Sequence, residues 1–168
     1  MREADEKLRD SRLVFYKEDI DKIDKMLEEM LRLSKAKCAL LIDKDGHLVT
    51  KSGGSSSYDT DTIAALVAGS FAATKEMARI LGEEEFSVLF HQGKKDNIHL
   101  TLVGNRTLLA IIFDDKTTVG MVRLYSNEVT KKMVQVFTDA SKKTGPKPTM
   151  DSGYSGAAQN KVDEFFRD

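Results

Sequence analysis

Apolar residues recur at helical spacing in three long segments of the chain. In each segment they follow one another at steps of three and four residues, so they share one stripe of a helix. The three predicted helices are Lys17–Ser34, Thr62–Leu81 and Thr118–Lys143. Asp59 or Asp61 can cap the second helix, Gly82 can end it, and Thr117 or Thr118 can cap the third, which Ser126-Asn127 could interrupt.

Five shorter apolar runs lie between these helices and have the length and composition of β-strands. They are Cys38–Ile42, His47–Thr50, Phe86–Phe90, Ile98–Val103 and Thr107–Phe113. Asp45-Gly46 separates the first two runs and predicts a two-residue hairpin turn, which makes these strands antiparallel. The predicted fold is therefore α+β, in the order α-β-β-α-β-β-β-α, with a mostly antiparallel sheet.

The two ends of the chain differ in composition from this central part. Residues 1–12 are dense in charge and poor in large apolar groups, which predicts a disordered arm before a domain of residues 13–143. Residues 144–157 are rich in Pro, Gly and small polar groups, which is typical of a flexible linker. Residues 158–168 carry Val162, Phe165 and Phe166 at helical steps among charges, so we expect a short amphipathic C-terminal helix there.

Composition excludes several classes of protein. Lys and Arg number 26 against 27 Asp and Glu, so no basic excess favours nucleic acid or an anionic membrane. Cys38 is the only cysteine, which excludes an internal disulfide and a cysteine-rich metal site and fits a reducing cytoplasm. No apolar run is long enough to span a bilayer. We expect a cytoplasmic protein without cofactor, metal or membrane insertion.

Motifs that could carry chemistry have simpler structural interpretations. Gly93-Lys94-Lys95 lacks the hydroxyl residue of a phosphate-binding loop, and Asp43-Lys44-Asp45-Gly46 lacks the acid spacing of a calcium loop. Both are better explained as turns. The histidines lie on different elements without ligand spacing and are expected at the surface or at strand edges, and Cys38 is expected to be an inert core thiol. These histidines are His47, His91 and His99.

The second predicted helix has an unusual distribution of side-chain sizes. One stripe carries large apolar residues that can anchor it on the sheet: Ile63, Leu66, Val67, Phe71, Met77 and Leu81. Another stripe carries tiny residues followed by one acid: Ala65, Ala68, Gly69, Ala72, Ala73 and Glu76. Exposed helix faces usually carry long polar groups, so a row of small residues indicates close approach of a second layer of this chain, a second copy or a partner.

Two further features leave alternatives open. Arg79 could act as an arginine finger toward a partner's nucleotide, but its place within a helix favours an ordinary exposed charge. The terminal Phe165-Phe166 pair can either fold back on its own domain or serve as a tethered second contact for a partner.

Several motifs resemble those of the Roadblock (dynein light chain-type) domain family, in particular its bacterial gliding-motility branch. The similarity covers residues 13–143 and resumes at Val162–Phe166. It is carried by Ala39-Leu-Leu-Ile-Asp-Lys-Asp-Gly46, Asp61-Thr-Ile-Ala-Ala-Leu-Val-Ala-Gly-Ser-Phe-Ala-Ala73, Leu81-Gly82-Glu83, Phe90-His-Gln-Gly93 and Ile112-Phe113-Asp114. Glu76 stands where family members have a small or neutral residue, and its charge could change the choice of partner.

The resemblance implies a fold, a partner and a function. The fold is a five-stranded antiparallel sheet with the second helix on one side and the other two on the opposite side. Its members form homodimers through paired second helices and joined edge strands, and one dimer binds one Ras-like GTPase of the MglA type in its GTP form. This branch stimulates GTP hydrolysis in cell polarity and gliding motility, with concentration of the dimer at a cell pole.

The same resemblance assigns roles to residues of this chain. The small stripe would be the dimer and GTPase contact: Ala65, Ala68, Gly69, Ala72, Ala73 and Glu76. Val162, Phe165 and Phe166 would be a second GTPase contact that favours nucleotide exchange. No residue of this chain would be catalytic. The alternatives are a Roadblock scaffold that binds a GTPase or motor component without altering turnover, and a small-molecule sensor on a similar sheet.

Overall fold

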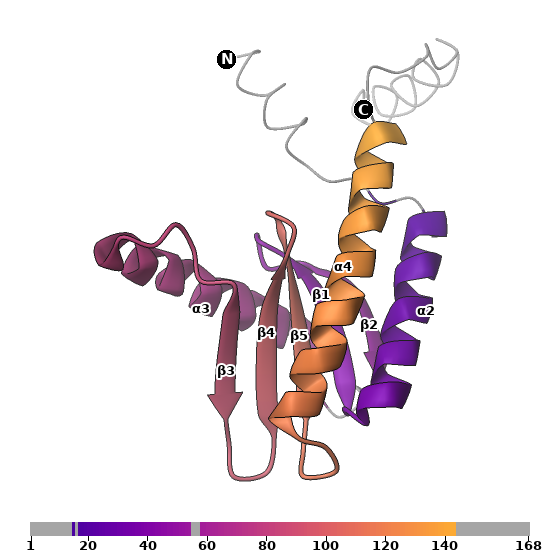
Figure 1. The fold of residues 1–168 in the computed structure, drawn as a ribbon, viewed down its shortest axis with the longest axis horizontal. Helices are drawn as coiled ribbons and strands as arrows, with labels where there is room; N and C mark the ends of the chain where they lie inside the picture. Colours follow the sequence, from indigo (N-terminus) through magenta and orange to yellow (C-terminus); the bar gives the residue numbers. More distant parts are fainter. Residues whose placement is uncertain (1–14, 16, 55–57, 144–168) are drawn as a thin grey trace, which may run out of the picture.

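A computed structural model describes Phe15, residues 17–54 and residues 58–143 of the chain. These residues form three helices and one five-stranded sheet (Figure 1). In chain order the elements are α2 (Lys17–Ser34), β1 (Cys38–Asp43), β2 (Leu48–Gly53), α3 (Thr60–Leu81), β3 (Val88–Gln92), β4 (Asn97–Val103), β5 (Thr107–Phe113) and α4 (Val119–Lys143). The predicted α+β order is confirmed, and the ends of α2 and β5 are those predicted.

The sheet is antiparallel throughout and has the strand order β2-β1-β5-β4-β3. β5, which is buried along its whole length, occupies the centre, so β2 and β3 are the two edge strands. The predicted two-residue turn at Asp45-Gly46 is wrong, because four residues, 44–47, connect β1 to β2. His47 N–H donates to Asp43 Oδ1 at 2.9 Å, which stabilises this longer turn.

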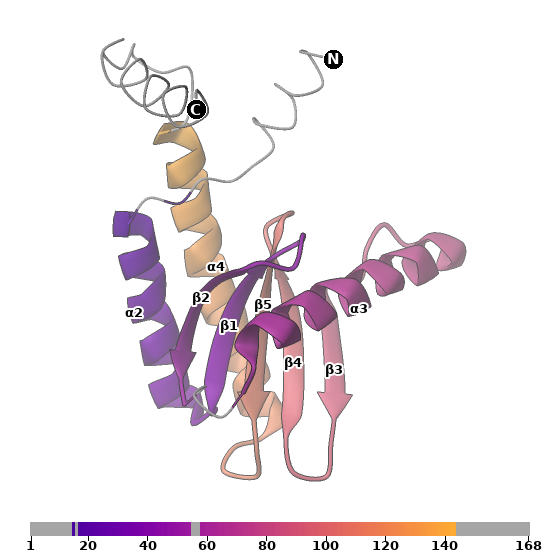
Figure 2. The same cartoon turned by 180° about the vertical axis from the view of Figure 1, so that it is seen from behind.

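The helices lie on both faces of the sheet, as the family resemblance implies. α2 and α4 cover one face, and α3 crosses the other (Figures 1 and 2). The first face packs Ile23, Leu27 and Met133 against Leu41, Leu109 and other strand residues. The second packs Ala64, Val67 and Phe71 against Leu40, Leu100 and their neighbours. The sheet is therefore the middle of three layers, and among the described elements α3 alone lies on the second face.

The helix ends follow the predicted capping chemistry. Asp59 caps α3, because its carboxylate accepts from Thr62 N–H at 3.2 Å, and Gly82 ends the helix with the positive φ of 79° that glycine adopts readily. Thr118 Oγ1 caps α4 by accepting from Met121 N–H at 3.2 Å. α4 is continuous through Ser126, whose buried hydroxyl lies 3.1 Å from Thr101 Oγ1 on β4. The side chain has a partner inside the fold and does not break the helix.

The predicted charged arm (1–12), linker (144–157) and C-terminal helix (158–168) lie outside the described residues, as do Val162, Phe165 and Phe166. Those assignments stay predictions. Among the helices that are described, none has the length and hydropathy to cross a membrane.

Candidate functional site

Fewer large side chains of α3 face the sheet than the sequence predicts. Its buried positions are Thr60, Ala64, Val67, Ala68, Phe71, Thr74 and Ala78. Leu66, Met77 and Leu81 are exposed, so the prediction that they anchor the helix on the sheet is wrong. Thr74 takes the sheet-facing place because its hydroxyl donates to the Phe71 carbonyl at 2.7 Å, which satisfies a polar group in the core.

The opposite face of α3 carries the small residues found in the sequence. Ala65, Gly69, Ala72 and Glu76 are exposed and recur at steps of four and three residues, and Ala73 is exposed beside them. We call the first four of these residues the small stripe. Ala68 does not belong to it, because Ala68 is buried with only 7% of its surface exposed, which corrects its predicted place at a contact.

One end of the small stripe has a neighbour within the chain. A Cβ added to Gly46, in the β1–β2 turn, would lie 3.1 Å from Ala65 Cα and 3.5 Å from Ala68 Cβ. Gly46 also has a positive φ of 92°, so the turn depends on glycine both for its conformation and for its close approach to α3. The small size of Ala65 and Ala68 is thus explained in part by packing of this turn.

Gly69 has no such explanation among the described residues. A Cβ added to Gly69 would have no heavy atom of theirs within 4 Å, apart from its chain neighbours and the backbone of its own helix. Glycine inside a helix costs about 0.5–1 kcal/mol relative to alanine, so a glycine with open space around it is unfavourable for the isolated helix. Gly69 is therefore the residue of the small stripe that points most directly to a contact outside the chain.

Large apolar side chains are exposed next to the small stripe. Leu66, Ile80 and Leu81 each have about two thirds or more of their surface exposed, at 66%, 72% and 70%, and Met77 has 52%. The C-terminal part of α3 extends past β3, the edge strand (Figures 1 and 2). Because three of these residues lie near this end of the helix, the chain itself covers little of their apolar surface. Exposed apolar residues grouped in this way make this end of α3 a candidate interaction site.

The small stripe ends in an ion pair. Arg79 Nε donates to Glu76 Oε1 at 2.9 Å, and Arg79 Nη2 donates to the same oxygen. Both side chains are exposed, which is the ordinary helix-face charge expected for Arg79 rather than the loop position of an arginine finger.

The two edge strands differ in how they are protected against pairing with another chain. β2 carries the exposed Lys51 and its pairing with β1 has a register shift at Leu41/Ile42, both of which disfavour addition of another strand. β3 pairs with β4 in unbroken register from Val88 to Gln92 and carries neither Lys nor Pro. β3 is thus an open edge beside the exposed end of α3.

Two titratable side chains, His99 and Cys38, are buried within the sheet. His99 was expected at the surface or at a strand edge, and this prediction is wrong, because His99 is 1% exposed in the middle of β4. Burial, with a smaller contribution from the Arg123 charge, lowers its pKa. Its Nδ1 lies 3.3 Å from Thr101 Oγ1, whereas Nε2 has no hydrogen-bond partner among the described residues. Cys38 is buried as predicted, and burial raises the pKa of its thiol to about 11.

No described group of three or more His, Cys, Asp or Glu residues could hold a metal ion. The Gly93-Lys94-Lys95 segment lies in the β3–β4 connection and Asp43–Gly46 at the β1–β2 turn. A partly exposed cluster joins the loops at one end of the sheet: Lys37 Nζ donates to Asp96 Oδ1 at 3.0 Å, which lowers the pKa of Asp96. This ion pair connects the segment before β1 to the β3–β4 connection.

The sequence identified the small stripe but missed the exposed apolar residues beside it. Leu66, Ala73, Met77 and Ile80 recur at steps of seven, four and three, which is a second helical stripe that could have been read from the sequence. The open edge of β3 depends on strand order, which has no local signal in the chain.

Comparisons with known proteins agree with this arrangement. MglB from Myxococcus xanthus is 36% identical, with a TM-score of 0.72, over 76% of this chain and 96% of that chain. The gliding protein MglB from Thermus thermophilus is 32% identical, with a TM-score of 0.71 and the same coverage. A structure described as MglB with tetrameric arrangement is 31% identical, with a TM-score of 0.73, over 76% of this chain and 96% of that chain.

A search of curated proteins finds no match to the sequence. The model of the Roadblock/LC7 domain family, in contrast, matches residues 22–113. This range is more than half of the chain and includes all of the sheet and α3. The chain belongs to the Roadblock/LC7 domain family.

Proposed function

We propose that this chain forms a homodimer that binds a bacterial Ras-like GTPase of the MglA type in its GTP form and stimulates GTP hydrolysis. The chain is most usefully compared with the MglB proteins, which match it at 31–36% identity and include a gliding protein. On this basis its cellular role is regulation of gliding motility and cell polarity. The chain itself is a regulator and not an enzyme.

The observation that carries the proposal is the outward face of α3. It combines Gly69, which has open space around its Cα, with Ala65 and Ala72 one turn to either side. Side chains this small let a partner's backbone approach the helix closely. Glycine at this position lowers the stability of the helix itself. Nothing in the described chain explains why Gly69 and Ala72 are so small. A contact with another molecule would explain it.

Two parts of this face fit two partners. Leu66, Met77 and Ile80 are large, apolar and exposed, and Met77 and Ile80 lie in the part of α3 that extends past the edge strand β3, so these residues suit pairing with a second copy related by a twofold axis. The small stripe of Ala65, Gly69, Ala72 and Glu76 suits a loop of the GTPase. Ala73 lies between them and would contact either. Val162, Phe165 and Phe166 would form a second contact that favours nucleotide exchange.

The mechanism needs no catalytic side chain from this chain. A GTPase hydrolyses GTP slowly when the loops that position water and stabilise charge are mobile. When binding holds those loops in the reactive geometry, the barrier to GTP hydrolysis falls, although the regulator adds no catalytic group. The rigid α3, capped at Asp59 and Gly82 and packed on the sheet, provides a surface on which such loops can be ordered.

The test is single-turnover GTP hydrolysis by the MglA-type GTPase of the same genome, with and without the full chain. Ala72→Arg places a long charged side chain on the exposed small stripe, where it does not disturb the core. We expect stimulation by the wild type and its loss, by about 100-fold or more, in Ala72→Arg. Circular dichroism and sedimentation confirm that the variant is folded and dimeric.

Stimulation that survives in a folded Ala72→Arg dimer would contradict the docking surface. Binding of the GTP form without stimulation would instead favour the alternative function, a scaffold that leaves turnover unchanged. Replacing Phe165 and Phe166 by Ala in the full chain tests the second contact separately, since we expect slower nucleotide exchange with hydrolysis on the bound complex little changed.

A further inference from the structure

One strip of the sheet has no described helix over it. α2 and α4 cover one face of the sheet, and on that face the edge strand β3 lies beside α4 and not under it (Figure 1). Phe90 of β3 pairs directly with His99 of β4, which pairs with Ile111 of β5, so the three side chains share one face. Ile111 belongs to the core under α2 and α4. Phe90 therefore lies on the face covered by α2 and α4, where 41% of its surface is exposed.

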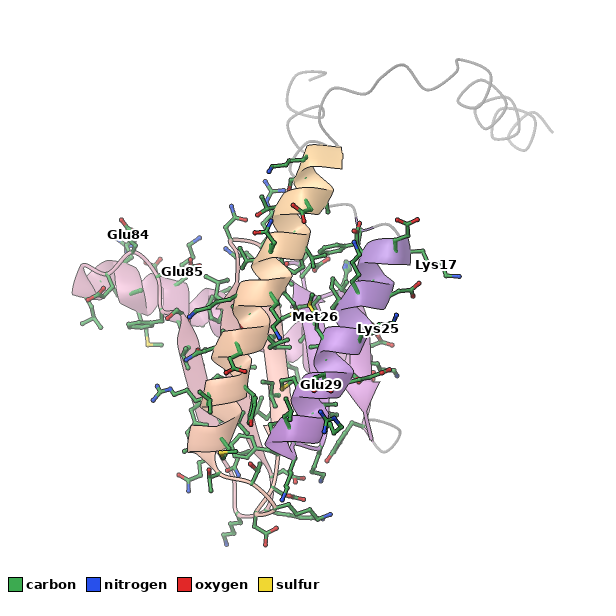
Figure 3. The ribbon with its side chains drawn as sticks, turned by 45° about the vertical axis from the view of Figure 1, so that its right-hand side comes forward. Lys17, Lys25, Met26, Glu29, Glu84 and Glu85 are labelled. Carbon is green, nitrogen blue, oxygen red and sulfur yellow. The ribbon has the colours of Figure 1, made fainter. Side chains whose placement is uncertain are left out.

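The two sides of α4 have different neighbours. On one side α4 packs against α2, whose Met26 lies toward α4 (Figure 3). Arg32 and, more weakly, Lys132 lower the pKa of Glu29 on α2, so Lys132 is on this side of α4. Arg123 comes nine residues before Lys132, which is about 2.5 turns of helix. Arg123 therefore lies on the opposite side of α4, toward β3.

The side of α4 toward β3 carries one row of residues at steps of three and four. Burial and, to a smaller extent, the charge of Arg123 lower the pKa of His99 on β4, so the row runs beside the strand that pairs with β3. The row consists of Val119, Arg123, Asn127, Thr130 and Val134. We call Phe90 and the exposed members of this row the β3–α4 patch: Phe90, Val119, Arg123, Asn127 and Val134.

The β3–α4 patch is apolar and carries one cation. Phe90, Val119 and Val134 are exposed apolar side chains, and neither the row nor β3 contains an acid. Arg123 is exposed and forms no hydrogen bond or ion pair with a described residue. Thr130, in the same row, has a buried hydroxyl without a hydrogen-bond partner among the described residues. The patch thus suits a segment that brings apolar side chains together with carboxylates.

The C-terminal segment of the chain has this composition. Its large apolar residues and its acids alternate within five positions: Val162, Asp163, Glu164, Phe165 and Phe166. The apolar groups match the exposed side chains of the patch, and the carboxylates match Arg123.

The length of the chain lets this segment reach the β3–α4 patch. Residues 144–161 separate Val162 from Lys143, the last residue of α4, and a coil of that length spans about 21–25 Å on average. Along α4 from Lys143, Val134 is about 14 Å away and Arg123 about 30 Å away. Such a tether gives an effective concentration of about 1 mM, so even a contact with a dissociation constant of about 1 mM is formed half of the time.

We propose that the β3–α4 patch binds the C-terminal segment of its own chain, residues 158–168. Phe165 and Phe166 lie on the exposed apolar side chains of the patch, and the two acids before them lie beside Arg123. The proposed function assigns the same two phenylalanines to the GTPase, so docking on the patch competes with that second contact. The docking itself is a property of the chain alone and does not require the GTPase.

The experiment uses the full chain with two introduced cysteines and measures how fast they form a disulfide within one chain in the presence of diamide. The patch pair is Asn127→Cys with Arg167→Cys. The control pair is Gln135→Cys with Arg167→Cys. Gln135 is also an exposed amide on α4, but it lies about 120° around the helix from Arg123 and closer to the C-terminal end of α4. Cys38 is buried and does not compete.

We expect the patch pair to form its disulfide about tenfold faster than the control pair, or more, in dilute protein. The tether alone favours the opposite order, because Gln135 is nearer to the start of the C-terminal segment. Replacing Phe165 and Phe166 by Ala, or Arg123 by Glu, should lower the rate of the patch pair to that of the control pair. Circular dichroism confirms that each variant is folded.

Equal rates for the two pairs, or a faster control pair, overturn the proposal. A fast patch pair that is unaffected by loss of both phenylalanines overturns it too, because the contact would then not be made by these side chains. A disulfide that forms only between two chains makes a second copy the source of the segment and overturns docking within one chain. None of these results bears on GTPase stimulation, which the single-turnover assay tests separately.

Discussion

Replacing Gly69 by alanine should strengthen the fold and weaken its contacts. The helix around Gly69 is regular and an added Cβ meets nothing within 4 Å, so the new methyl group causes no clash within the chain. Alanine is more favourable than glycine at an exposed helix position by about 0.5–1 kcal/mol. For a domain of this size, that corresponds to an increase in Tm of about 1–4 °C.

The effect on association should have the opposite sign. If a partner's backbone lies against Gly69, the added methyl group separates the surfaces or forces a shift, and overpacking of this kind costs about 1–3 kcal/mol. That is a weakening of about five- to 150-fold in the dissociation constant of whichever complex uses this contact. Stability and affinity therefore move in opposite directions from one substitution.

Separate measurements distinguish the effect on stability from the effect on association. Thermal unfolding at low protein concentration reports the fold, while sedimentation and titration with the GTP-loaded GTPase report the dimer and the complex. Gly120→Ala is the matched control, because Gly120 lies in the first turn of α4 and its added Cβ makes only an ordinary contact with Thr118, at 3.8 Å. If Gly69→Ala and Gly120→Ala behave alike in all three measurements, Gly69 makes no contact outside the chain and the reasoning is refuted.

Two further predictions concern other residues. Burial lowers the pKa of His99, so the unfolded chain binds more protons below about pH 6.5 and stability falls as pH falls through this range. His99→Phe should reduce this loss, as measured by urea unfolding at several pH values; an unchanged pH dependence of stability in this variant would contradict the assignment to His99. Arg79→Ala should retain most GTPase stimulation in the single-turnover assay; a loss of about 10³ or more would instead identify an arginine finger.

The elements of this fold were predictable because their signals are local. The apolar spacing of Lys17–Ser34, the cap at Asp59 and the glycine at position 82 each act within a few residues, and all were found where expected. The strand order was not predictable in this way, since placing β5 between β1 and β4 is decided by burial over the whole chain. The sequence predicts His99 at the surface or at a strand edge, since its alternation with Leu100 is that of a half-buried strand, whereas in the structure α4 covers that face.

The candidate site shows the same limit for a different reason. The sequence identified the small stripe from composition, but it assigned Leu66, Met77 and Leu81 to the sheet because large apolar residues are normally buried. In the structure smaller side chains, Ala64, Thr74 and Ala78, take those sheet-facing places, and α3 continues past the edge of the sheet. Val67 and Phe71 still anchor α3 on the sheet, but Leu66, Met77, Ile80 and Leu81 stay exposed to solvent. Burial of these four side chains against a second molecule, as the proposed function requires, would give them the apolar environment that the described residues do not provide.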